Sequence, residues 1–118
     1  MWELDKSRPI CPQLCEQICV KIANGEYKAD ERIPSVREIA VEAGVNPNTV
    51  QKALATLTEQ GLLYSMRGSG MYVSNNNSGA SEKIDEIKEQ NTIKFIDSMK
   101  VLGLSLEEIK EYVKGWKE

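Results

Sequence analysis

The sequence predicts a mainly α-helical fold with one small β-hairpin. Three features between residues 25 and 73 carry this prediction: a helix-capping pair at Ser35 and Glu38, a helix start at Asn46, and a glycine-containing tip at residues 67–70 between two apolar segments. The resulting order is helix, tight turn, helix and hairpin. That order is typical of a winged helix-turn-helix, so residues 1–74 are expected to form one such domain.

The first helix of this motif is expected to begin near Ser35. Ser35 and Glu38 have the spacing of a capping box, in which each side chain accepts a hydrogen bond from the backbone N–H of the other residue. Gly44 tolerates positive φ and ends the helix, so the turn falls at Gly44-Val45. The apolar positions that follow helical spacing are Val36, Ile39, Ala40 and Ala43.

The second helix is expected to run from Asn46 to about Gln60. Asn46 suits the N-cap, and Pro47 suits the first helical position, where a missing N–H costs nothing. At about 100° per residue, this helix has two different faces. The apolar face consists of Val50, Ala53, Leu54 and Leu57. The polar face consists of Asn48, Thr49, Lys52 and Thr56.

The polar face carries side chains of the types that contact duplex DNA. Asn can form two hydrogen bonds with adenine, Thr can contact a base or a phosphate, and Lys neutralises phosphate. After Gly61, two apolar segments flank the tip 67–70, which predicts a hairpin whose glycines let the backbone approach phosphates closely. Arg67 at this tip and Arg37 near the first helix start are further candidates. An ordinary solvated face on a protein-binding domain is the alternative interpretation.

These segments resemble the N-terminal domain of GntR-type bacterial transcription regulators. The resemblance covers most of residues 9–74 and depends on many residue types at fixed offsets. The matching segments are Gly25-x-Tyr27, Ile33-Pro34-Ser35-x-Arg37-Glu38-Ile39-Ala40, Gly44-Val45, Thr49-Val50, Ala53-Leu54-x-x-Leu57, Gly61-Leu62 and Gly68-x-Gly70. Together with the residue chemistry above, the resemblance implies these DNA-binding candidates: Ser35, Arg37, Asn46, Asn48, Thr49, Gln51, Lys52, Arg67, Gly68 and Ser69.

The run from Asn46 to Lys52 is similar to the small YtrA-type subfamily. Many other relatives carry arginines at the positions of Pro47 and Gln51, where an arginine could contact guanine. The subfamily resemblance implies two C-terminal helices used for dimerisation and, beyond that, control of a nearby transporter operon.

Residues 75–80 are small and polar, which predicts a linker, and residues 81–118 are expected to form two helices separated at Gly103. Ser105 and Glu108 form a second capping box at the start of the last helix. Two helices of this size cannot bury their apolar faces alone, so we expect a homodimer formed by two copies of this C-terminal segment. Packing onto the chain's own winged helix would instead leave a monomer.

The candidate dimerisation residues are Ile84, Ile87, Asn91, Phe95, Met99, Leu102, Leu106, Ile109, Val113 and Trp116. Asn91 lies amid the apolar stripe of the first of these helices, where it either pairs across the interface and fixes the register or faces solvent at the edge.

Three cysteines, Cys11, Cys15 and Cys19, are spaced by four on a helix expected from about Pro12 to Asn24. Their apolar neighbours favour a packing role. A thiolate metal site or a thiol sensor is the alternative, but the sequence has no His and the spacing matches no common zinc pattern. We therefore expect no cofactor and no bound metal.

Composition fits a small regulator. The 118 residues carry a net charge of −3, so DNA binding is expected to rest on local cations and to be salt-dependent. The sequence contains no stretch of about 18 apolar residues and no signal sequence, which predicts a cytoplasmic protein. It also contains no phosphate loop and no nucleophile beside an evident base, so an enzyme is not expected.

The sequence therefore predicts a dimeric, sequence-specific DNA-binding transcription regulator, and repression at a pseudo-palindromic operator is the favoured mode. Two recognition helices held one DNA turn apart would strengthen each other's weak contacts. A winged-helix adaptor that binds only protein is the alternative function. The sequence identifies no effector molecule.

Overall fold

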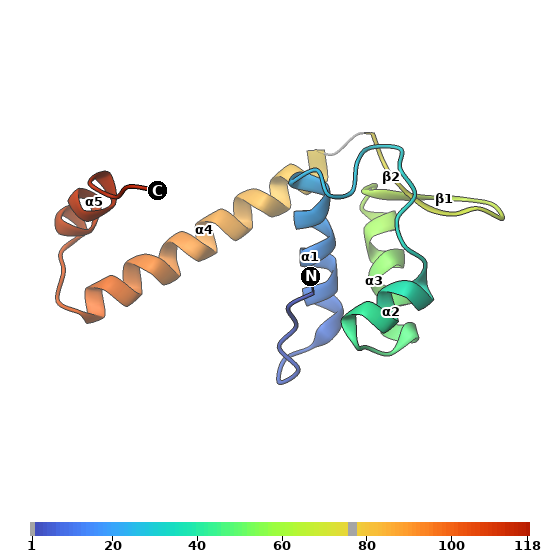
Figure 1. The fold of residues 1–118 in the computed structure, drawn as a ribbon, viewed down its shortest axis with the longest axis horizontal. Coiled ribbons are helices and arrows are strands. Elements are labelled where there is room, and N and C mark those ends of the chain that lie inside the picture. Colours follow the sequence, from blue (N-terminus) through green and yellow to red (C-terminus); the bar gives the residue numbers. More distant parts are fainter. Residues whose placement is uncertain (1, 76–77) are drawn as a thin grey trace. The chain divides into compact units, whose positions relative to one another are not determined.

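The computed structural model describes residues 2–75 and 78–118, which contain five helices and a two-stranded antiparallel sheet (Figure 1). The elements are α1 (Ile10–Ala23), α2 (Val36–Ala43), α3 (Pro47–Glu59), β1 (Leu63–Met66), β2 (Gly70–Val73), α4 (Ser78–Val101) and α5 (Leu106–Lys114). The predicted fold class, mainly α-helical with a hairpin wing, is confirmed. The chain divides into two compact units, Met1–Ile84 and Asp85–Glu118, which are described separately.

Local capping sets the starts of α2 and α3, as the sequence predicts. The Ser35 hydroxyl accepts the Glu38 N–H at 3.1 Å, and the Glu38 carboxylate accepts the Ser35 N–H at 2.9 Å. Gly44 ends α2 in the left-handed conformation, with φ of 68°. Asn46 then caps α3, and Pro47 is its first residue. These local contacts define where α2 starts and ends and where α3 starts, on either side of the turn.

The core of the first unit lies among α1, α2 and α3. Helix α3 contacts both other helices, and its apolar residues Val50, Ala53 and Leu57 are fully buried. Replacing one such buried leucine by alanine typically costs about 2–5 kcal/mol, so this stripe fixes the rotation of α3 about its own axis. The α1 residues in the same core are Leu14, Ile18, Cys19 and Ile22.

The hairpin continues the core as a wing that projects from the helices in Figure 1. Its register pairs Leu63 with Val73 and Met66 with Gly70. A further extended segment, residues 30–33, runs along β2: the Asp30 N–H donates to the Val73 carbonyl at 2.8 Å, and the Ile33 N–H donates to the Met71 carbonyl at 2.9 Å. The wing base is therefore held on both edges of β2.

Helix α1 begins two residues before the predicted start at Pro12. Pro9 occupies the N-cap position with ψ of 132°, and Pro12 lies in the first turn, where the N–H has no helical partner to lose. Proline at this place is compatible with a helix that has already started, so the expectation of a start at Pro12 is wrong by half a turn.

The second unit contains most of α4 and all of α5. Gly103, with φ of 95°, follows the end of α4, and the predicted capping box of Ser105 and Glu108 begins α5. Helix α4 already begins at Ser78, so residues 78–80 of the expected linker are helical, while residues 76–77 lie outside the described residues. No helix in the described part of the chain is long and apolar enough to cross a bilayer.

The last helix ends earlier than the sequence predicts. Helix α5 stops at Lys114, and Gly115 follows as its C-cap, so Trp116 lies beyond the helix and not on its apolar stripe. Glycine loses more backbone freedom in a helix than other residues, which favours the end at this point. The Trp116 ring nevertheless stacks on Tyr112, with ring centroids 5.8 Å apart.

Candidate nucleic-acid interface

The polar face of α3 is open to solvent along its first two turns. Asn48, Gln51 and Lys52 are exposed and Thr49 is half-buried, while the opposite face of the helix is buried in the core. Further along, the Thr56 hydroxyl donates to the Lys52 carbonyl at 3.0 Å, so its proton is already used within the helix. The side chains available to a ligand are therefore concentrated at the N-terminal half of α3.

Asn46 has a structural role at the start of this face. Its side-chain oxygen accepts the Asn48 N–H at 2.8 Å, which satisfies one of the free backbone donors of the first turn. The Asn46 side chain is exposed, and its NH₂ group keeps two donors for an external partner. Asn46 thus combines a cap with a position next to the exposed polar face.

The N-terminus of α2 contributes Ser35 and Arg37. Ser35 is half-buried and its oxygen takes part in the capping box, while Arg37 is exposed. The pKa of Glu38 lies below its ordinary value because its carboxylate accepts the Ser35 backbone N–H and the Ser35 side chain also interacts with it. The Glu38 charge is thereby held at the helix N-terminus, where it stabilises α2, and Arg37 remains available.

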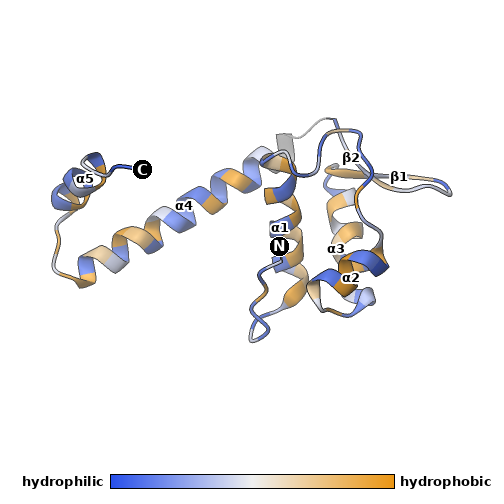
Figure 2. Ribbon diagram, viewed as in Figure 1, coloured by the Kyte–Doolittle hydropathy of each residue, from blue (hydrophilic) through white to orange (hydrophobic). Residues whose placement is uncertain are grey.

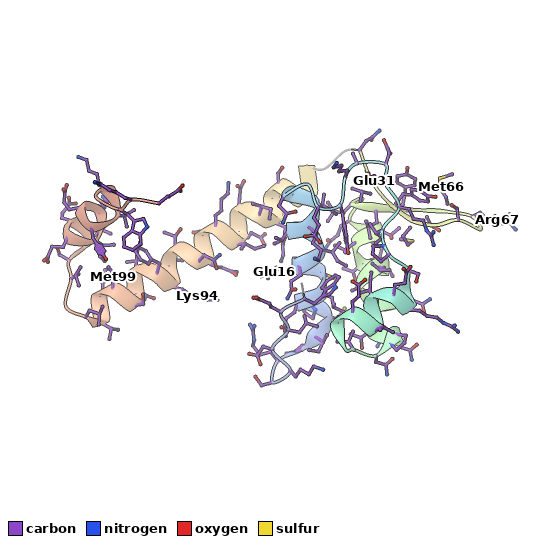
Figure 3. The ribbon with its side chains drawn as sticks, in the orientation of Figure 1. Glu16, Glu31, Met66, Arg67, Lys94 and Met99 are labelled. Atoms are coloured by element: carbon purple, nitrogen blue, oxygen red, sulfur yellow. The ribbon has the colours of Figure 1, made fainter. Side chains whose placement is uncertain are left out.

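The wing tip places a cation at the outer end of the hairpin. Arg67, Gly68 and Ser69 are all exposed, and Figure 3 shows the Arg67 side chain at the far end of the wing. Gly68 has φ of 76°, which other residues rarely adopt, and the Ser69 N–H donates to the Met66 carbonyl at 2.9 Å to close the turn. Helix α3, the start of α2 and the wing thus carry the predicted DNA-binding residues, all within the first unit.

The order of α1, α2, α3 and the wing is that of a known family of regulators. Residues 12–73 match the family model described as bacterial regulatory proteins, gntR family. The chain belongs to the GntR family. This match covers most of α1 and all of α2, α3 and the wing of this GntR-family protein, which includes every predicted DNA-binding residue.

Relatives of this GntR-family protein extend the likeness to nearly the whole chain. The uncharacterized HTH-type transcriptional regulator YhcF of Bacillus subtilis is 32% identical over 98% of this chain and 96% of its own length. The transcriptional repressor YtrA of the same organism is 36% identical over 92% of this chain and 84% of its own length. The YtrA-type resemblance is therefore confirmed.

Solved structures agree with the family assignment. A GntR family transcriptional regulator from Listeria monocytogenes superposes with a TM-score of 0.77 at 36% identity, covering 97% of this chain and all of the other. The DNA-binding domain of AraR in complex with its operator ORE1 superposes with a TM-score of 0.53 at 36% identity, covering 61% of this chain and 83% of that domain. This GntR-family protein is a DNA-binding transcription regulator, and its family comprises regulators and not enzymes.

Sequence reasoning missed the cation Arg32. It lies in the extended segment beside β2, where its backbone forms an isolated antiparallel β-bridge with Tyr72. The alternation of an exposed Arg32 with a buried Ile33 is the pattern of an edge strand, and this signal was present in the sequence. It also missed Lys6, whose ammonium donates to the Gly44 carbonyl at 2.8 Å, at the turn between α2 and α3.

The three cysteines lie at buried or half-buried positions of α1, as a packing role predicts. Cys19 is buried, whereas Cys11 and Cys15 are half-buried, and all three are free thiols. Burial raises the pKa of Cys15 to about 12, and its thiol donates to the Ala53 carbonyl of α3 at 3.6 Å. Residues 2–75 and 78–118 contain no group of three or more His, Cys, Asp or Glu side chains placed to hold a metal ion.

The candidate dimerisation residues differ widely in exposure. Ile109 is 2% exposed, whereas Phe95 is 42% and Trp116 is 67% exposed. Ile84, Ile87 and Met99 are half-buried, and the exposed members of the set are Asn91, Phe95, Leu102, Leu106, Val113 and Trp116. Apolar residues recur along α4 and α5 in Figure 2. The second unit therefore leaves most of its predicted dimerisation stripe uncovered.

Proposed function

We propose that this protein is a homodimeric repressor that acts in the cytoplasm on a pseudo-palindromic operator. The observation that carries the proposal is the exposed N-terminal half of α3, whose opposite face is anchored in the core. Asn48 and Gln51 would contact base edges in the major groove, and Lys52 would contact a phosphate. Arg37 and Arg67, at the start of α2 and the wing tip, would contact the backbone or a narrow minor groove on either side.

The dimer rests on the second unit. Phe95, Met99, Tyr112, Val113, Trp116 and Glu118 line an open groove of about 570 Å³. A second copy of the same surface would cover this apolar groove with an identical one, as a two-fold interface does. The two α3 helices could then occupy half-sites about 34 Å apart, one turn of B-DNA.

Selection of bound sequences from a random duplex pool tests the operator. We expect enrichment of an inverted repeat whose half-site centres are separated by about one or two helical turns. Enrichment of a single half-site would contradict the dimeric mode, and binding to no duplex even at low salt would favour the protein-binding adaptor.

Sedimentation tests the dimer. Phe95→Glu introduces a charge at an exposed position, so the isolated chain should fold as before, but a charge buried in an interface is costly and the dimer should dissociate. Gln90→Glu is the matched control, because it adds the same charge at an exposed α4 position outside the stripe. A Phe95→Glu protein that sediments as the parent dimer would contradict this interface.

A further inference from the structure

Arg32 occupies a defined place at the edge of the wing. The Val73 N–H donates to the Glu31 carbonyl at 3.0 Å, and the Ile33 N–H donates to the Met71 carbonyl at 2.9 Å, so the backbone on both sides of Arg32 is bonded to β2. Ile33 is buried and Arg32 is exposed, as alternate residues of an edge strand are. The backbone of Arg32 is therefore fixed beside the wing.

The Arg32 side chain lies against the first residue of β2. A β-carbon at Gly70 would stand 2.9 Å from Nε and 3.7 Å from Cζ of Arg32, so the guanidinium lies on the place that a Gly70 side chain would fill. Gly70 ends the hairpin tip, three residues after Arg67 in the sequence. The Arg32 guanidinium thus lies beside the start of β2, whereas the Arg67 cation lies at the wing tip.

The same cation is within electrostatic reach of α2. The pKa of Glu38 is lowered first by its hydrogen bond from the Ser35 N–H, and the charge of Arg32 adds to that lowering. Among the residues the structure describes, no carboxylate lies within salt-bridge distance of Arg32. Arg32 is therefore exposed, acts electrostatically on Glu38 near the start of α2, lies beside Gly70 of the wing, and has no ion-pair partner among the described residues.

We propose that Arg32 binds a backbone phosphate of the DNA duplex next to the wing, and that it holds the wing in position for this contact. The proposal rests on the DNA-binding function proposed above and adds a cation to the α2 and wing-tip contacts. A guanidinium offers several donors in a planar fork that matches a phosphate, and one that already lies along a strand loses little freedom on binding.

This role has a measurable signature, because each phosphate neutralised by the protein releases counterions. Losing one contact per protomer lowers the slope of log affinity against log salt by about 0.9, or about 1.8 for a dimer. Between about 50 mM and about 200 mM salt, the parent should therefore lose roughly 10-fold more affinity than a variant without this contact. A residue that only braced the wing would leave this slope unchanged.

The test measures affinity for a random duplex at several salt concentrations, using the full chain. Arg32→Gln removes the charge and keeps a long polar side chain that can still lie on Gly70. Arg32→Lys keeps the charge and loses the fork, so it should retain the salt slope. Lys88→Gln on α4 is the control for the same change in net charge. The Lys88 ammonium is 3.6 Å from the Asp85 carboxylate.

The expected result is a flatter salt slope for Arg32→Gln, with parent-like slopes for Arg32→Lys and Lys88→Gln. A parent-like slope and affinity for Arg32→Gln would overturn the inference while leaving DNA binding intact. If the parent itself showed no salt-dependent binding, the proposed function would fail instead. Circular dichroism identifies an unfolded variant, and in that case Arg32→Lys decides: a flattened slope despite its retained charge would also overturn the inference.

Discussion

The Asn46 side chain has two roles, because it caps α3 and also lies beside the face proposed to contact DNA. Substitutions of Asn46 can separate the stability of α3 from its contact with DNA. Its oxygen accepts the Asn48 N–H at 2.8 Å, and the rest of its amide is exposed beside the polar face. Asn46→Asp keeps the capping oxygen and adds a negative charge, which the N-terminus of a helix favours. The same charge would face the phosphates of a bound duplex.

The capping role predicts a change in stability, and the DNA-facing role predicts a change in affinity. Asn46→Ala should lower stability by about 1 kcal/mol, the usual cost of a lost cap. For a unit the size of Met1–Ile84, this corresponds to a fall of about 4–8 °C in melting temperature. Asn46→Asp should melt at or above the parent temperature. Its repulsion from one phosphate is about 1 kcal/mol or more at close range, which is about fivefold in affinity per protomer and about 25-fold for a dimer.

Thermal melts followed by circular dichroism, together with fluorescence anisotropy on labelled duplex, measure both quantities on the same samples. Asn46→Ser is the control, because it retains a capping oxygen without a charge. If Asn46→Asp bound duplex at low salt as tightly as the parent, the start of α3 could not lie against the DNA backbone. If Asn46→Ala melted like the parent, the capping argument would be wrong.

Further predictions concern the recognition helix, a capping carboxylate and a buried thiol. Lys52→Ala should weaken binding to every duplex and flatten its salt dependence, whereas Asn48→Ala should lose discrimination at particular base pairs, as competition with selected and mutated sites would show. The lowered pKa of Glu38 means that its stabilising effect is present above its ordinary value of 4.5 and is lost as the pH falls through the folded value, so acid melts of Glu38→Gln should fall less steeply than those of the parent. The raised pKa of Cys15 leaves little thiolate at neutral pH, so iodoacetamide should label Cys15 far more slowly than a free thiol, as mass spectrometry of digests would show; rapid labelling together with oxidant-dependent DNA affinity would support a sensor.

The parts of the fold that could be predicted are those set by neighbours in sequence. The capping boxes at Ser35 and Ser105, the left-handed Gly44 and the cap at Asn46 all involve residues within four positions of each other. The two faces of α3 followed from helical spacing alone. Such features need no knowledge of the rest of the chain, and the structure confirms them.

The features that were missed depend on contacts between distant parts of the chain. Arg32 gains its position from the pairing of its segment with β2, some 40 residues later, and Lys6 gains its position from the Gly44 carbonyl. The start of α1 at Ile10 was missed for a local reason, because Pro12 is as compatible with the first turn as with the helix start. The roles of the DNA-binding and dimerisation residues stay predictions, since they concern molecules outside the chain.

The wing owes its firmness to contacts made well below its tip. Tyr64 stacks on Tyr72 at 5.7 Å between ring centroids, and the Tyr64 hydroxyl donates to the Asp30 carboxylate at 3.0 Å, while residues 30–33 lie along the other edge of β2. A hairpin restrained in this way loses its conformational entropy on folding, so little more is lost when a ligand binds. Substitutions of Tyr64 or Asp30, neither of which is a proposed DNA contact, should therefore slow association, because the wing would then lose conformational entropy on binding.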